Sequence, residues 1–113
     1  MTLTHADFQA IASKLTPNGQ AYIDGKFCDA ADDDKFETIN PATGQVLAEV
    51  AHCKSADVDR AVAAARRVFN DGTWSRAEPE FRKDVLLKVA ALVREHTNEL
   101  AVLESLDTGK TIT

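Results

Sequence analysis

Two cysteines and three histidines are the side chains best suited to chemistry in this chain, and their spacing matches no common reactive site. A cysteine becomes nucleophilic when a nearby base or helix amino terminus stabilises its thiolate. Cys28 is expected just after a hairpin turn and Cys53 just after a strand, so both are interpreted as packing or surface residues. The spacing of these two cysteines and of His52 and His96 matches no zinc-binding motif. We therefore expect no catalytic residue in this chain, although a triad assembled from distant residues is not tested by sequence alone.

The glycine spacing argues against a nucleotide-binding loop. All five glycines are at least six residues apart, so the G-x-G-x-x-G fingerprint of dinucleotide-binding domains is absent. Gly109-Lys110-Thr111 resembles the end of a phosphate-binding P-loop, which also needs a glycine five positions before Gly109, where Glu104 stands. Gly109 is better interpreted as a helix-terminating glycine. No cofactor-binding residue is therefore predicted.

The composition is that of an ordinary globular segment. Apolar residues make up 44% and charged residues 27% of the 113 residues, and the net charge is −5. This balance is typical of a folded chain, and it lacks the basic excess of a general nucleic-acid binder. No apolar run approaches the roughly 18 residues that span a bilayer. We expect a cytoplasmic protein with no nucleic-acid and no membrane partner.

The first half of the chain is predicted to form an amphipathic arm and two β-hairpins. Residues 1–20 form the arm, in which Thr4 caps a helix of about three turns that ends before Pro17. Asp24-Gly25 lies between two short β-prone runs, a strong signal for a two-residue hairpin turn. A second pair of strands is expected at 36–39 and 45–51. Because two hairpins alone would be marginal, another layer must cover them.

The second half is predicted to be helical. Ser55 is expected to cap a helix that ends near Gly72, and Pro79 to occupy the first position of the next helix. The buried face of that second helix is assigned to Val85, Leu86, Val89, Leu92 and Val93. A break near residues 96–98 separates it from a shorter helix that closes at Gly109. These elements predict an α/β segment, with residues 21–113 as one unit.

Several motifs in register resemble the amino-terminal segment of the aldehyde dehydrogenase superfamily. Residues 36–44 read Phe-Glu-Thr-Ile-Asn-Pro-Ala-Thr-Gly, residues 56–66 read Ala-Asp-Val-Asp-Arg-Ala-Val-Ala-Ala-Ala-Arg, and residues 103–110 read Leu-Glu-Ser-Leu-Asp-Thr-Gly-Lys. The resemblance runs from about residue 22 to 110. It implies that 21–113 are the hairpins and helices of a cofactor-binding domain that is incomplete in this chain, whose parallel sheet comes later.

The resemblance also implies a reaction. The complete enzyme would oxidise a small-molecule aldehyde to the carboxylic acid with NAD or NADP, through a cysteine thiohemiacetal and hydride transfer. The family's catalytic residues lie beyond position 113, so this chain alone is expected to be inactive. Residues 54–60 and the arm look most like the corresponding segments of enzymes that act on ω-amino or γ-glutamylamino aldehydes from polyamine breakdown. Enzymes of betaine aldehyde or of general aliphatic aldehydes share most of these motifs. A homo-oligomer is expected by analogy.

The resemblance also implies part of a cation-binding site in this chain. Many family members bind a monovalent cation at positions that correspond to Thr38, Ile39 and Asp107. Potassium and sodium ions are hard cations that prefer oxygen ligands, which backbone carbonyls and a carboxylate supply. The alternative is that Thr38 is an ordinary strand residue and Asp107 a surface acid at a helix end.

Two hypotheses about the whole chain make different predictions. A truncated aldehyde dehydrogenase should expose apolar helix faces, because its helices expect a missing sheet. A stand-alone, non-catalytic binding or assembly module should fold alone and unfold in one cooperative transition.

Overall fold

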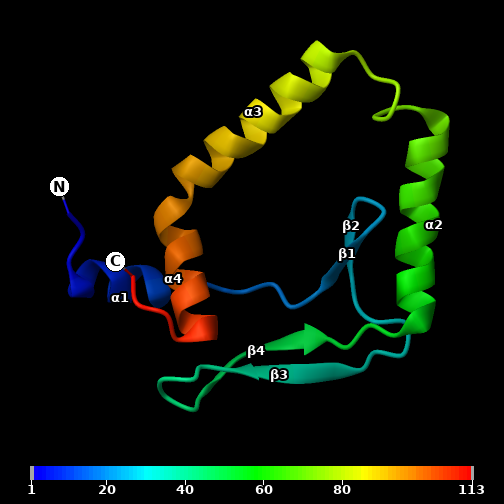
Figure 1. Cartoon of the computed structure of the whole chain (residues 1–113). Helices are drawn as coiled ribbons and strands as arrows, with labels where there is room; N and C mark the ends of the chain where they lie inside the picture. The colour runs from blue at the N-terminus through cyan, green and yellow to red at the C-terminus, as the bar shows by residue number, and fades with distance from the viewer. Residues whose placement is uncertain (1, 113) are drawn as a thin grey trace.

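A computed structural model describes residues 2–112, and Figure 1 shows that they form an open arc. Along this part of the chain the elements are α1 (His5–Ala12), β1 (Ala21–Ile23), β2 (Lys26–Cys28), β3 (Lys35–Ile39), β4 (Val46–Ala51), α2 (Ser55–Asp71), α3 (Pro79–Glu95) and α4 (Thr97–Thr108). The arc runs from α2 through α3 to α4, with the hairpins between the two ends.

The arm begins as predicted and ends early. Thr4 caps α1: its Oγ1 accepts from the backbone N–H of Asp7, whose carboxylate accepts from the backbone N–H of Thr4 at 2.8 Å. The helix ends at Ala12, so it has about two turns where three were predicted. Ser13 donates its side-chain hydroxyl to the carbonyl of Ala10, and tight turns follow. The helix packs against α4 (Figure 1).

Both predicted hairpins form, as two separate two-stranded antiparallel sheets. Asp24 and Gly25 both have positive φ, 54° and 74°, as a two-residue turn with right-handed strand twist requires. The pairing of β3 with β4 shifts register between Thr38 and Ile39. This irregularity falls at the first two positions predicted for the cation site.

The start of α2 is tied to the loop after β2 by a buried carboxylate. The helix begins at Ser55, so Lys54 is the N-cap residue and the prediction of Ser55 as cap was one residue off. Asp57 is 2% exposed. It accepts from the backbone N–H groups of Lys54 at 3.1 Å and Ala31 at 3.0 Å, and from the Arg60 guanidinium at 2.7 Å. The Asp57 side chain thereby accepts from a backbone N–H at the helix start, which has no partner within the helix, and from an N–H of the loop.

The end of α2 is capped from the following loop. Gly72 has a φ of 82°, as predicted for a helix-terminating glycine. Ser75 Oγ donates to the carbonyl of Phe69 at 2.7 Å, and the Arg76 guanidinium donates to the carbonyls of Asn70 and Asp71. Three carbonyls that a helix end leaves without partners are thus satisfied.

The last two helices meet at the predicted break. Pro79 is the first residue of α3, which ends at Glu95, and His96 separates it from α4. Gly109, with a φ of 74°, closes α4. No helix within residues 2–112 is long and apolar enough to cross a membrane.

The chain buries little of its apolar surface. Across residues 2–112 the buried apolar residues are Ala30 and Val102. The accessible surface is 8674 Å², where a compact protein of 12.3 kDa has about 6,100 Å². The radius of gyration is 17.8 Å, against about 13 Å for a compact domain of this length. The α3 face predicted to be buried is exposed at Leu86, Val89, Leu92 and Val93. It is exposed because α3 makes its main contact only at its end, with α4.

Candidate functional site

An open pocket of about 370 Å³ lies between the carboxyl end of α4, the β3–β4 hairpin and the segment before β1. Thr38 and Asp107, two of the three predicted cation-site residues, line this pocket together. They are 69 positions apart in the sequence. Ile39 is adjacent to Thr38, and its side chain is exposed outside the lining. The remaining lining residues are Pro17, Asn18, Gly19, Leu47, Ala48, Val50, Leu100, Leu103, Glu104 and Thr108.

Close packing at the turn of the β3–β4 hairpin holds the end of α4 beside this pocket. A Cβ at Gly109 would lie 3.0 Å from Cγ of Pro41, so glycine allows the helix end to approach the turn. The Gly109 N–H donates to the carbonyl of Ser105 at 2.9 Å, which closes the helix. On the strand side, Thr38 donates its hydroxyl to the carbonyl of Ala48 at 3.4 Å. Two elements far apart in sequence therefore line the same pocket.

Sequence reasoning missed Glu104, a second carboxylate of the pocket. It lies three residues before Asp107, a spacing that places two side chains on one helix face, so helical periodicity could have found it. Lys110 Nζ donates to Glu104 Oε1 at 2.9 Å. This hydrogen bond lowers the pKa of Glu104 and raises the pKa of Lys110. Because Lys110 offsets the charge of Glu104, Asp107 carries the uncompensated negative charge.

The donors on the pocket walls are oxygen atoms of hydroxyl, amide and carboxylate side chains, with apolar leucine and valine side chains between them. Such donors suit a hard monovalent cation. From Thr2 to Ile112 no group of three or more His, Cys, Asp or Glu side chains could hold a metal ion. The zinc arrangement considered for Cys28, His52, Cys53 and His96 is therefore not formed.

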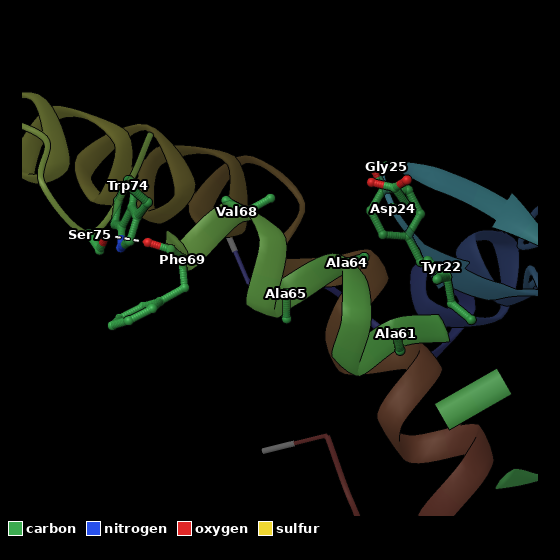
Figure 2. Close-up of a pocket in the computed structure, with 11 residues that line it drawn as sticks. Tyr22, Asp24, Gly25, Ala61, Ala64, Ala65, Val68, Phe69, Trp74 and Ser75 are labelled. Atoms are coloured by element: carbon green, nitrogen blue, oxygen red, sulfur yellow. Dashed lines mark hydrogen bonds between the residues drawn. The ribbon is translucent and has the colours of Figure 1, made fainter. Parts of the chain in front are cut away.

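A second open pocket, of about 530 Å³, lies between the β1–β2 hairpin and α2. Figure 2 shows Tyr22, Asp24 and Gly25 from the hairpin, and Trp74 and Ser75 beyond the end of α2. The α2 wall consists of small or apolar side chains, namely Ala61, Ala64, Ala65, Val68 and Phe69. The one carboxylate in the lining, Asp24, is paired with Arg67 of α2. The lining therefore offers packing surface and no group positioned for acid–base or nucleophilic chemistry.

The aspartate run in the loop before β3 forms an exposed ion-pair network with the segment before α2. Lys54 Nζ lies 2.5 Å from a carboxylate oxygen of Asp32 and 2.9 Å from one of Asp34. Asp34 also accepts from His52 Nδ1 at 2.9 Å. The hydrogen bonds from Lys54 lower the pKa of Asp32 and of Asp34 and raise the pKa of Lys54. The run fastens a loop, and its spacing lacks the alternating ligands of a calcium loop.

The two cysteines lie in separate parts of the fold, at the end of β2 and before the start of α2. Cys28 and Cys53 are free and half-buried. Cys28 ends β2 beside Arg60, whose guanidinium is engaged by Asp57. Cys53 precedes α2 in the loop that carries His52. Their interpretation as packing or surface residues stays a prediction.

Comparison with known proteins matches most of the chain to aldehyde dehydrogenases. Residues 27–113 match the aldehyde dehydrogenase family. The aminoacetaldehyde dehydrogenase of Pseudomonas aeruginosa is 50% identical over 110 residues, which cover 97% of this chain and 22% of the relative.

Two solved structures share the fold of the segment. Indole-3-acetaldehyde dehydrogenase in complex with NAD⁺ matches with a TM-score of 0.90 and 43% identity, over 93% of this chain and 21% of its own. The γ-glutamyl-γ-aminobutyraldehyde dehydrogenase of Burkholderia cenocepacia matches with a TM-score of 0.89 and 51% identity, over 92% of this chain and 21% of its own.

The chain spans about a fifth of the length of these relatives. Its hairpins and helices are therefore an incomplete part of the α/β fold of those enzymes, as the motifs predicted. The sequence, the arrangement of the elements and the family match agree, and this chain belongs to the aldehyde dehydrogenase family.

Proposed function

We propose that this chain is the amino-terminal part of an NAD-dependent aldehyde dehydrogenase that oxidises an aldehyde to the carboxylic acid. The family match over residues 27–113 carries this proposal. A related enzyme of the same fold binds NAD⁺. In the present chain the glycines are too far apart to cradle a dinucleotide, so NAD or NADP would be held by residues outside it. The contribution of residues 2–112 is scaffolding.

The proposed substrate is an ω-amino or γ-glutamylamino aldehyde. Support comes from the aminoacetaldehyde and γ-glutamyl-γ-aminobutyraldehyde dehydrogenases, which are 50% and 51% identical to this chain. The family resemblance also leads us to propose a homo-oligomeric, cytoplasmic enzyme. The alternative of a stand-alone binding module is disfavoured by the exposed apolar face of α3, which such a module would have to bury.

A graft tests the proposed activity. In the grafted enzyme, residues 1–113 of this chain replace the aligned segment of the Pseudomonas aeruginosa aminoacetaldehyde dehydrogenase. Because the segment supplies scaffold and no catalytic group, the grafted enzyme should reduce NAD⁺ with aminoacetaldehyde within about ten-fold of the parent's kcat/KM. The unmodified relative is the control. A soluble, folded graft that forms no NADH would contradict the proposal.

We also propose that the pocket of Thr38 and Asp107 binds K⁺ or Na⁺, with backbone carbonyls of Thr38 and Ile39 and the Asp107 carboxylate as ligands. Support comes from the shared lining by Thr38 and Asp107 and from the all-oxygen donor set. Crystals of the grafted enzyme soaked in thallium(I) should show anomalous density between these residues, and Asp107→Asn should abolish it. Glu99→Gln, on the same helix and outside the pocket lining, is the matched control. Equal anomalous density in the grafted enzyme and in its Asp107→Asn variant would show that Asp107 is not a ligand of the ion.

A further inference from the structure

The segment before β1 contains the one asparagine–glycine pair of the chain, Asn18-Gly19. Gly19 packs against β4 so closely that a Cβ there would clash with the carbonyl oxygen of Glu49. Asn18 is exposed and lines the pocket of Thr38 and Asp107. A glycine that the packing requires is thus placed directly after an asparagine whose side chain is accessible to water.

The side-chain amide of Asn18 is folded back toward the backbone that follows it. Its Oδ1 accepts from the backbone N–H of Gln20 at 2.9 Å. The ring closed by this hydrogen bond contains both Cγ of Asn18 and the backbone nitrogen of Gly19. The N–H of Gln20 draws electron density toward Oδ1 and would stabilise an oxyanion formed there, so Cγ becomes a better electrophile.

The backbone nitrogen of Gly19 is the nucleophile available to this carbon. Within residues 2–112 its N–H donates to no protein group, whereas the Gly19 carbonyl accepts from the N–H of Ala51 at 2.8 Å. Glycine has no Cβ that would shield the nitrogen. Rotation about the bonds of the exposed Asn18 can therefore bring Cγ to this nitrogen while the Gly19 carbonyl stays bonded to β4.

The other three asparagines lack this combination. Asn40 forms the same kind of turn, since its Oδ1 accepts from the N–H of Ala42 at 2.9 Å, but the next residue is Pro41, which has no N–H. Asn70 lies in α2 and Asn98 in α4. In a helix the backbone fixes the next peptide group, and the Cβ of the next residue shields its nitrogen. The geometry therefore sets Asn18 apart.

We propose that Asn18 is a site of spontaneous deamidation, and that the fold confines this reaction to Asn18 among the four asparagines. The Gly19 nitrogen gives its proton to hydroxide and bonds to Cγ of Asn18. The bond from Cγ to Nδ2 breaks, and ammonia leaves with a proton from water, which gives a succinimide. Water then opens this ring at Cγ to yield aspartate, or at the backbone carbonyl carbon to yield isoaspartate. No atom is oxidised or reduced.

The reaction changes both the pocket and the contact with β4. Either product adds a negative charge to a lining that already includes Glu104 and Asp107. Isoaspartate also lengthens the main chain by one carbon directly before Gly19, which has no space to move toward Glu49. We therefore expect the hydrogen bond between Gly19 and Ala51 to weaken. The proposal is independent of the proposed function, because it requires neither catalysis nor a bound cation.

Ageing of the grafted enzyme at mildly alkaline pH tests the proposal, with a peptide of residues 13–24 as reference. Peptide mass spectrometry locates the gain of about 1 Da that accompanies loss of ammonia and uptake of water. We expect Asn18 to deamidate within about three-fold of the rate in the peptide, and at least about ten-fold faster than Asn40, Asn70 and Asn98. The rate should increase with pH, because the deprotonated nitrogen attacks.

Asn18→Gln is the matched control. It keeps the amide, but its extra methylene group requires a six-membered ring, so this position should gain no mass in the same period. The peptide covering 46–51 should exchange its amide hydrogens about three-fold faster in the aged grafted enzyme than in the aged Asn18→Gln variant, because Ala51 loses its acceptor.

Three results would overturn the proposal. Deamidation of Asn18 more than about ten-fold slower in the grafted enzyme than in the peptide would show that the fold protects this residue. Equal rates at Asn18 and at Asn70 or Asn98 would show that the fold does not confine the reaction. Equal exchange at 46–51 in the two aged proteins would show that the product leaves the contact with β4 intact. NADH formation by the grafted enzyme enters none of these measurements, so the proposed function fails or holds separately.

Discussion

Replacing Asp57 with alanine in the grafted enzyme is expected to speed hydrogen exchange at the amides of Ala31 and Lys54 by about 100-fold. Both amides donate to the Asp57 carboxylate, whose side chain is 2% exposed. Removal of the carboxylate leaves two backbone donors and the Arg60 guanidinium without their acceptor. The start of α2 and the loop after β2 should then separate, because this side chain joins them. Exchange detected by mass spectrometry on peptides covering 29–35 and 52–58 measures the effect.

Asp59→Ala is the matched control for this experiment. Asp59 lies on the same first turns of α2, is exposed, and makes no hydrogen bond through its side chain to the loop after β2. Exchange at both peptides should match the wild type in this variant. If Asp57→Ala and Asp59→Ala exchange equally, the carboxylate of Asp57 does not hold the two segments together.

The pH dependence of this effect has a definite sign. The backbone N–H of Lys54 lowers the pKa of Asp57 below its ordinary value of 3.8, with help from Arg60 and the N–H of Ala31. A carboxyl group with a lowered pKa contributes stability above its unfolded pKa and loses it as the pH falls through its folded pKa. The ratio of exchange rates between Asp57→Ala and the wild type should therefore stay constant above pH 4 and decrease below it. If the ratio of exchange rates did not change with pH below 3.8, the Asp57 carboxylate would not act through its negative charge.

Replacing Gly19 with alanine is expected to detach the segment before β1 from the edge of β4. A Cβ at Gly19 would lie 1.8 Å from the carbonyl oxygen of Glu49, a distance that forces the backbone of one of the two segments to move. The Gly19 carbonyl accepts from the N–H of Ala51 at 2.8 Å, and this bond should break. Exchange at the peptide covering 46–51 should rise by about ten-fold or more, since the lost bond protects its last amide.

Gly44→Asn controls for the loss of a glycine in the same hairpin. Gly44 has a φ of 73° and no atom within 4 Å of its Cβ position, and asparagine tolerates a left-handed conformation. The β4 peptide should exchange as in the wild type in this variant. Equal acceleration by both substitutions would mean that the hairpin turn, and not the close approach at Gly19, limits exchange.

Local signals predicted the elements well because each depends on neighbouring residues. Asp24-Gly25 predicted a hairpin whose turn needs two positive φ angles, and both are present. Pro79 and Gly109 marked a helix start and a helix end where the structure has them. The capping signal at Thr4 was correct, whereas the length of α1 was overestimated, because the periodic Leu15 falls in turns after the helix.

The parts that sequence reasoning missed depend on contacts between distant segments. Asp57 lies on the first turn of α2, and its bond to Ala31 spans 26 positions, so no local pattern predicts it. Helical periodicity correctly found the apolar face of α3, but it does not say what covers such a face. For the cation pocket the sequence predicted Thr38 and Asp107 through resemblance. Glu104 follows from its helical spacing to Asp107, whereas Asn18 joins them because the adjacent Gly19 packs against β4 at Glu49.

The central claim is that this chain is scaffold of an aldehyde dehydrogenase and carries none of its catalytic groups. The most direct test compares NADH formation from NAD⁺ and aminoacetaldehyde by the purified 113-residue chain and by the grafted enzyme at equal concentration. The account predicts NADH from the grafted enzyme and none from the chain alone. Aldehyde-dependent NADH formation by the 113-residue chain would contradict it.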